Sequence, residues 1–543
     1  MTEQSETQST TTATETVSWL ALIIIVLAQM QMAFNVNAIP VSVGPIVADL
    51  NTSATSVGTA LVVYSLFVAA FVMVGAKLGK IFGARLVFQV TALAHGVAMA
   101  LMALSPSTQA VNLAQAMAGL AAAALVPTLV VLIAATYHGR QQAQALGILA
   151  GTPALSGALA FFIAGYLGTA LSWRYSFGIL FFLSLAVFAL SFRLKPVPRQ
   201  GGVKIDYTGA LLSGIAVILI SLGFNNLTNW GIVLARPAAP FNLLGLSPSL
   251  LFLVVGLMLF QAFFAWSHQR VESGKKPLLA LEVLDSPQER AAIITLLIIG
   301  SLGPAVNFLI PLYIQIVQGR TSLFTAVAVI PYTLAIATSA ILIVRLYDRL
   351  TPRQIAVVAL GAVSIGLTIL AFTIRSDWGT PVVILGLIII GLGEGAMLTL
   401  LFNVLVSASP KELAGDVGAL RGVANNMSTA LGTAFASVAA VGFLTLIVTS
   451  LLAQSALPDS LRTQINLDNV DFIANEQLET YLDENTDATL GDVAVAVQIN
   501  IDARLHALKA SFLILAGFAL LGIFPALGLP SYRPGEIPPD TGS

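Results

Sequence analysis

Glu394 is the residue of this sequence whose surroundings most clearly suggest chemistry. It stands in Gly391-Leu-Gly-Glu-Gly395, and it is the only carboxylate clearly inside a long apolar run. A charge at the centre of a bilayer costs about 2.5–3.5 kcal/mol on insertion scales, so it is tolerated mainly where it faces a cavity or a partner. Two interpretations remain open: a site that binds and releases protons, for which Glu394 and Arg421 are the candidates, or a structural ion pair with Arg421 or Lys411.

Amide side chains recur in the apolar runs, where an amide that faces lipid is unfavourable and most should face inward. The candidates for a polar substrate path are Gln31, Asn35, Asn37, Gln115, Asn307, Gln315, Asn403 and Asn426. Hydrogen bonds between helices are the alternative explanation for each of them. The amides are densest in the first apolar run, so we expect the polar path to follow that run.

The sequence offers little for metal, redox or nucleophilic chemistry. It contains no cysteine, and its histidines show no metal-ligand spacing. It also lacks a phosphate-binding P-loop, and therefore an ATPase of its own. We expect no cofactor, no bound metal and no enzymatic activity.

The composition places the chain in a membrane. Of its 543 residues, 57% are hydrophobic and only 9% are charged, whereas a soluble chain needs about a quarter charged. The net charge of −1 gives no electrostatic basis for binding nucleic acid. The chain must have a surface that faces the lipid bilayer.

The apolar runs predict an all-α polytopic membrane protein. About 20 apolar residues in a helix cross the ~30 Å hydrocarbon core of a bilayer, and continuous runs of this length do not suit strands. The sequence predicts about fourteen transmembrane helices by this measure. They lie near 18–38, 56–76, 85–105, 110–135, 143–169, 175–193, 208–226, 249–267, 291–317, 322–344, 355–374, 380–408, 420–450 and 507–529.

Lysine and arginine collect in the loops of one side, which we call the basic side. These residues are Lys77, Lys80, Arg85, Arg140, Arg193, Lys195, Arg199, Lys204, Arg270, Lys275, Lys276, Arg290, Arg345, Arg349, Arg353 and Lys411. The loops of the opposite side hold only Arg174, Arg236, Arg320, Arg375, Arg462 and Arg504. Basic loops stay in the cytoplasm, so we expect the basic side and both termini to be cytoplasmic.

Two basic segments divide the chain into related halves. Gly75-Ala-Lys-Leu-Gly-Lys-Ile-Phe-Gly-Ala-Arg85 is echoed by Val344-Arg-Leu-Tyr-Asp-Arg-Leu-Thr-Pro-Arg353. Matching them predicts two pseudo-symmetric six-helix bundles with two inserted helices, a pattern typical of secondary transporters. The expected units are a disordered cytoplasmic terminus (1–17), an N-terminal bundle (18–193), the inserted helices (194–289), a C-terminal bundle (290–529) with an extracytoplasmic loop (452–505), and a cytoplasmic tail (530–543).

The sequence resembles the major facilitator superfamily, in particular its 14-helix drug–proton antiporters. The resemblance rests on Arg345-Leu-Tyr-Asp348-Arg349, Leu-Ser-Trp173-Arg174, Pro311-Leu-Tyr313-Ile-Gln315, Gly119, Pro127 and Ile205-Asp206-Tyr-Thr-Gly209. It implies two bundles that rock against each other around a substrate path between them. It also implies a cytoplasmic gate formed by Gly75, Lys80, Gly83, Arg85, Asp348 and Arg349.

Several positions depart from the pattern of that family. Lys80 stands where the family has an Asp, Asn35 where it has an acidic residue, and Gln115 where it has an Arg. The family's Gly-Pro pair is replaced by Ala160-Phe161. Neither Asn nor Gln can titrate, so these two positions cannot carry the proton of an antiporter.

We therefore expect a secondary active transporter in the cytoplasmic membrane of a bacterium, acting as a monomer. Its expected function is export of an amphipathic or lipophilic small molecule by alternating access, with protons as the exchanged ion. One alternative is an uncoupled or differently coupled transporter of an endogenous solute or lipid. Another is a non-transporting membrane partner in envelope assembly.

Overall fold

The computed structural model describes residues 18–52, 54–201, 203–284, 286–320, 322–376, 381–409, 411–455, 457–458, 475–486 and 488–532. The expected disordered terminus (1–17), residues 533–543 of the expected tail and residues 459–474 of the expected outer loop lie outside these ranges. Fourteen helices of the described ranges are long and apolar enough to cross a membrane. The predicted all-α architecture with fourteen transmembrane helices is confirmed.

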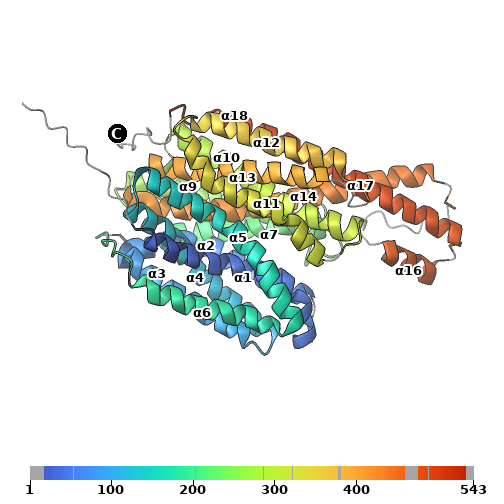
Figure 1. Ribbon diagram of the computed structural model, residues 1–543, viewed down its shortest axis with the longest axis horizontal. Coiled ribbons are helices and arrows are strands. Elements are labelled where there is room, and N and C mark those ends of the chain that lie inside the picture. The colour runs from blue at the N-terminus through green and yellow to red at the C-terminus, as the bar shows by residue number, and fades with distance from the viewer. Residues whose placement is uncertain are drawn as a thin grey trace, which may run out of the picture.

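The N-terminal bundle forms the lower group of helices in Figure 1. Its helices are α1 (Leu20–Leu50), α2 (Ala54–Phe82), α3 (Ala84–Ala103), α4 (Thr108–Thr136), α5 (Gly139–Ala170) and α6 (Trp173–Ser191). Two transmembrane helices follow, α7 (Tyr207–Asn225) and α9 (Pro248–Glu272), with the short α8 (Leu227–Trp230) between them and a 3₁₀ turn at Leu281–Leu284 after them.

The C-terminal bundle forms the upper group of helices in Figure 1. It comprises α10 (Pro287–Pro311), α11 (Ser322–Leu342), α12 (Pro352–Thr373), α13 (Pro381–Ala408), α14 (Ala414–Gln454) and α17 (Leu490–Leu521). A π-helical turn at Leu312–Val317 extends α10, and 3₁₀ turns at Ile343–Leu346 and Lys411–Leu413 flank α11 and α14. The short helices are α16 (Asn475–Asn485) and α18 (Ile523–Ala526).

Polar N-caps define where several apolar runs begin as helices. Asp206 accepts a hydrogen bond from the Gly209 amide at the start of α7. Ser286 and Glu289 form a capping box at the start of α10, and Thr351 forms one with Gln354 at the start of α12. These side chains satisfy backbone amides that a helix start would otherwise leave unpaired.

The two bundles repeat one packing order. In the first, α2 packs against α4, α3 against α4 and α6, and α1 against α5. In the second, α11 packs against α13, α12 against α13 and α17, and α10 against α14. The repeat extends to single residues. Gly119 of α4 packs on the backbone of Tyr64 in α2, and Gly391 of α13 packs on the backbone of Tyr332 in α11.

The inserted helices lie beside the seam between the bundles. Helix α7 packs against α2 of one half and α14 of the other, and α9 packs mainly against α7. Most of α9 is apolar and not buried in protein, as expected for a face that contacts lipid.

The segment expected as the extracytoplasmic loop (452–505) is partly helical, in the stretches near 475–482 and 490–508 whose sequence allows a helix. Helix α14 has 41 residues, or about 60 Å of helix, twice the hydrocarbon thickness. Together with α17 it projects past the other helices on the side of α16 (Figure 1). The last helix begins at Leu490 instead of near 507 because Thr489 and Asp492 form a capping box there. Asn475 ties α16 to α17 by accepting hydrogen bonds from Asn500, at 3.2 Å, and from Arg504.

The tight contact between α2 and α4 makes Gly75 a test of the fold. A Cβ at Gly75 would lie 2.5 Å from Ala124 Cα, so Gly75→Ala must push the two helices apart. We expect a loss of about 1–3 kcal/mol, measured as a lower melting temperature of the purified protein in detergent. The matched change Gly361→Ala, where nothing lies within 4 Å of the added Cβ, should not lower it. Equal melting temperatures for both variants would contradict this packing.

Candidate functional site

Glu394 lies in the middle of α13, inside the C-terminal bundle. Only 7% of the residue is exposed, and the Tyr332 hydroxyl of α11 donates a hydrogen bond to its Oε2 over 2.5 Å. Oε1 faces Gly303 of α10, where an added Cβ would lie 2.9 Å from Glu394 Cδ. One carboxylate oxygen is therefore held by a tyrosine, and the other is directed at a bare stretch of backbone.

Glycines bring these groups together. A Cβ at Gly391 would lie 2.6 Å from the Tyr332 carbonyl oxygen, and one at Gly395 would lie 2.9 Å from Ile336 carbonyl carbon. Without side chains at these two positions, α13 can press directly onto α11. That close approach puts the Tyr332 hydroxyl within reach of Glu394.

Arg421 of α14 does not serve as the counter-ion of Glu394. Its guanidinium stacks over the Phe402 ring of α13, with 4.2 Å from Cζ to the ring centroid. None of the ion pairs found in the described ranges joins Arg421 to Glu394. The side chain of Lys411, the other expected partner, lies outside the described part of the structure. Arg421 instead forms a cation–π contact within the same bundle.

The predicted path amides of the N-terminal bundle each form at least one hydrogen bond to one another or to a neighbouring residue. Asn35 of α1 and Gln115 of α4 exchange two hydrogen bonds, of 2.9 and 3.0 Å, and both are fully buried. The Gln31 carbonyl oxygen accepts a hydrogen bond of 3.0 Å from the Ser184 hydroxyl of α6. Asn37 donates to the Ala33 carbonyl of its own helix over 2.7 Å. Three of the predicted path residues thus join helices to one another.

The amides of the C-terminal bundle differ among themselves. Asn403 donates to the Thr399 carbonyl over 2.9 Å, and Asn426 donates to that of Gly422 over 2.8 Å. Gln315 is half-buried in the π-helical turn. Asn307 is exposed although α10 lies within the bundle. It stands one helical turn from Gly303, on the same face of α10.

A buried ion cluster connects the two halves on the basic side. Asp416, in the first turn of α14, pairs with Lys77 over 3.0 Å and with Lys80, and both lysines lie at the end of α2. The side-chain exposures are 7% for Lys77, 10% for Lys80 and 1% for Asp416. The charge reversal at Lys80 is therefore matched by a carboxylate in the opposite half.

The other predicted gate residues have separate tasks. Gly83 joins α2 to α3 with a φ of 92°, a conformation that favours glycine. Arg85 donates to the Phe192 carbonyl at the end of α6 over 2.8 Å. Asp348 pairs over 3.2 Å with Arg140 of the N-terminal half, not with its neighbour Arg349, which is exposed. Both members of the Asp348–Arg140 pair are more than half exposed, so it contributes little energy.

Close helix contacts surround these ion pairs. A Cβ at Gly418 of α14 would lie 3.0 Å from Pro127 Cα of α4, and one at Gly147 of α5 would lie 2.6 Å from the Ala340 carbonyl of α11. Both contacts cross between the halves near the helix ends that carry the basic loops. The halves therefore touch through backbone as well as through charge on the basic side.

Three of the residues in these contacts, Lys77, Asp416 and Tyr332, were not predicted from the sequence as site residues. Lys77 lies three residues before Lys80, on the same helix face, and that spacing is a signal for a shared partner. Asp416 lies in a predicted loop close to the start of an apolar run, where an acid is ordinarily a helix cap. Nothing in the sequence indicates that Tyr332 reaches Glu394.

Comparison with known proteins agrees with this architecture. The family model described as "Major Facilitator Superfamily" matches residues 24–433. The chain is 27% identical to the puromycin resistance protein pur8 of Streptomyces alboniger, over 78% of this chain and 82% of that protein. It is 26% identical to the tetracenomycin C resistance and export protein of Streptomyces glaucescens, over 77% and 75%. It is 24% identical to the multidrug efflux pump LfrA of Mycolicibacterium smegmatis, over 78% and 81%.

Solved structures share the fold at low sequence identity. The human organic anion transporter MFSD10 (TETRAN) superposes with a TM-score of 0.55 at 13% identity, over 93% of this chain and 98% of that chain. The proton:xylose symporter XylE superposes with a TM-score of 0.52 at 11% identity, over 93% and 94%. The two-bundle arrangement is therefore common to transporters whose sequences differ widely.

The buried ion cluster makes Asp416→Asn a direct test of the gate. Removing the carboxylate leaves two buried lysines without a counter-charge, which costs about 3–5 kcal/mol while they stay buried. We expect the halves to separate on the basic side to relieve this cost. Spin labels at Lys195→Cys and Arg353→Cys, one in each half, should report a longer distance. The control Glu412→Gln changes an exposed neighbouring acid, and a distance unchanged in both variants would contradict a closing role for the cluster.

Proposed function

The chain belongs to the Major Facilitator Superfamily, and from this premise we propose that it exports an amphipathic or lipophilic small molecule in exchange for protons that bind at Glu394. That it is a membrane transporter and not an enzyme follows from its family. The proposed direction and substrate class rest on relatives whose names describe resistance, export or efflux. The observation that carries the proton site is the buried carboxylate between α10, α11 and α13.

Glu394 has the features that a proton carrier needs. It is enclosed within the membrane-spanning part of the bundle, where a permanent charge is costly. The Tyr332 hydroxyl stabilises the ionised form through Oε2, while Oε1 can accept a proton. Glu394 can take up a proton from one side of the membrane and release it to the other. In this cycle the side chain alternates between its neutral and its ionised form.

The ion cluster on the basic side supplies a reversible closing contact. Burying Lys77, Lys80 and Asp416 costs desolvation energy, and their attraction offsets much of that cost. A cluster of this kind holds the halves together, while the free energy needed to separate them stays small. The bundles can then expose the path between them to each side in turn.

The substrate path is proposed to pass beside the proton site. Asn307 is exposed one turn from Gly303, which faces Glu394. A substrate bound at Asn307 would lie close enough for the charge of Glu394 to influence its binding. Asn403, Asn426 and Gln315 remain candidates on the C-terminal side of the path, and Gln31, Asn35, Asn37 and Gln115 on the N-terminal side.

A second candidate function is transport without proton coupling. It is favoured by the Asn35–Gln115 pair, in which two amides satisfy each other and neither can titrate. These two positions then contribute no proton site, and proton coupling through the proposed site would depend on Glu394. Transport of an endogenous solute or lipid down its gradient would need no titrating group.

The orientation and oligomeric state belong to the same proposal. We place the basic side and both termini in the cytoplasm of a bacterium, because the basic loops favour that side. Since one chain supplies both bundles, a monomer contains the whole proposed path.

Replacing Glu394 separates the two functions. We expect Glu394→Gln to abolish substrate-driven proton movement in reconstituted vesicles, a loss of at least about tenfold, while downhill exchange of substrate persists. Tyr332→Phe removes only the hydroxyl and should shift the pH at which transport is half-maximal. The control Glu412→Gln should behave as the unmodified protein. Full proton movement in Glu394→Gln would assign coupling elsewhere, and no proton movement in the unmodified protein would favour the uncoupled function.

The absence of cysteine makes the orientation directly testable. Leu244, between α8 and α9, is 96% exposed, and Lys275 is exposed on the basic side. In intact cells, a membrane-impermeant maleimide should label Leu244→Cys and leave Lys275→Cys unlabelled until the cells are broken. The opposite labelling pattern would reverse the proposed orientation.

A further inference from the structure

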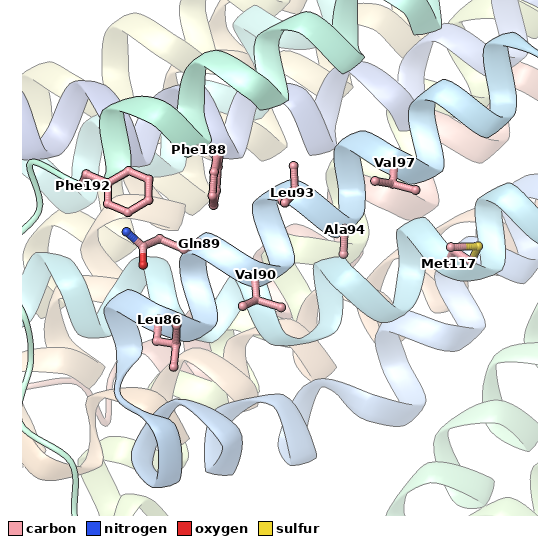
Figure 2. A pocket seen from close by; sticks show the side chains of 9 residues that line it. All are labelled: Leu86, Gln89, Val90, Leu93, Ala94, Val97, Met117, Phe188 and Phe192. Carbon is pink, nitrogen blue, oxygen red and sulfur yellow. The ribbon is translucent and has the colours of Figure 1, made fainter.

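An apolar groove lies on the outer face of the N-terminal bundle, away from the proposed substrate path. It has a volume of about 590 Å³, and its walls come from α3, α4 and the end of α6. The lining residues, shown in Figure 2, are Leu86, Gln89, Val90, Leu93, Ala94, Val97, Met117, Phe188 and Phe192. Val90 is 58% exposed, so the groove is open to the surroundings of the bundle, which at this height are lipid.

The length of the groove along α3 matches the thickness of one leaflet of the bilayer. It extends along α3 from Leu86, near the basic side, to Val97. Eleven residues of helix rise about 16 Å, or half of the ~30 Å hydrocarbon core. An acyl chain of the leaflet on the basic side therefore matches the groove in length and in polarity.

Gln89 is a polar exception in these apolar walls. It is only 8% exposed, and its Nε2 is buried without a hydrogen-bond partner. Its amide lies between Phe192 and Leu86 in Figure 2. A buried donor without a partner costs about 1–3 kcal/mol, and a turn of the amide toward the groove would let an acceptor there recover that energy.

The mouth of the groove on the basic side carries cations without acidic partners. Arg85 precedes Leu86 and donates to the Phe192 carbonyl, while Arg193 and Lys195 follow Phe192 and are exposed. None of these three takes part in an ion pair found in the described ranges. The positive charge at the mouth is thus available to an anion.

We propose that this groove binds one anionic phospholipid from the leaflet on the basic side. An acyl chain lies against Leu93, Val97 and Met117, a glycerol ester carbonyl accepts a hydrogen bond from Gln89 Nε2, and the phosphate lies near Arg85 and Arg193. An apolar small molecule would leave the amide and the cations unused. A free phosphate would leave the groove empty. A molecule with an acyl chain, an ester carbonyl and an anionic head uses all three features.

Binding can be measured by native mass spectrometry of the purified full-length protein titrated with phosphatidylglycerol. We expect Gln89→Leu to weaken binding about fivefold, the effect of one hydrogen bond. Val90→Trp should fill the groove and weaken it by at least about tenfold. The matched control is Val358→Trp on α12, the counterpart of α3 in the other half, where Val358 is 68% exposed. It should bind like the unmodified protein, and gel filtration checks that every variant is folded.

Two further probes separate the possible occupants. Phosphatidylcholine, which is neutral overall, should bind more weakly than phosphatidylglycerol, and Arg193→Gln with Lys195→Gln should remove that difference. Lys275 is an exposed cation far from the groove in sequence. The control Lys275→Gln should leave the difference between the two lipids unchanged. Equal binding of both lipids to the unmodified protein, displacement by inorganic phosphate alone, or identical effects of Val90→Trp and Val358→Trp would each overturn the proposal.

Discussion

A single carboxylate between two lysines, sealed from water where the two halves of the chain meet, governs the arrangement described here. Asp416 and the two lysines come from opposite bundles, and each side chain is almost wholly buried. A buried charge is tolerated only beside its counter-charge, so the ends of α2 and α14 must stay together while this state persists. The small residues Gly418 and Gly147 let the flanking helices close around that contact. For the halves to separate on the basic side, these ion pairs must break and the charged groups must be hydrated instead.

The pseudo-symmetry of the bundles makes their chemical asymmetry informative. The contact of Gly119 with the Tyr64 backbone in one half is repeated by the contact of Gly391 with the Tyr332 backbone in the other. Three residues beyond the glycine, the N-terminal half has Ala122 and the C-terminal half has Glu394. At this matched position the scaffold thus carries a carboxylate in the C-terminal half only, while Asn35 and Gln115 form a neutral hydrogen-bonded pair in the N-terminal half.

The architecture could be predicted because the bilayer imposes strong rules on sequence. Backbone groups in hydrocarbon must bond within the chain, so each long apolar run had to be a helix. The two basic segments indicated two halves because each lies between two long apolar runs at a corresponding place in the chain. The ends of the last helices could not be placed, since α14 and α17 continue beyond the hydrocarbon, where hydropathy carries no signal. There a capping box at Thr489 decides the boundary.

Sequence alone determined which groups were available: a carboxylate within an apolar run, amides in the first helix, and a lysine where related proteins have an acid. Only the tertiary structure decided their partners. It paired Lys80 with Asp416 across 336 positions, placed Tyr332 on Glu394, and directed Arg421 to Phe402 instead of to a carboxylate. The physical reason is that hydropathy specifies how deep a helix lies but not its rotation about its own axis. That rotation is set by close packing at residues such as Gly391 and Gly395, and it selects the side chains that meet.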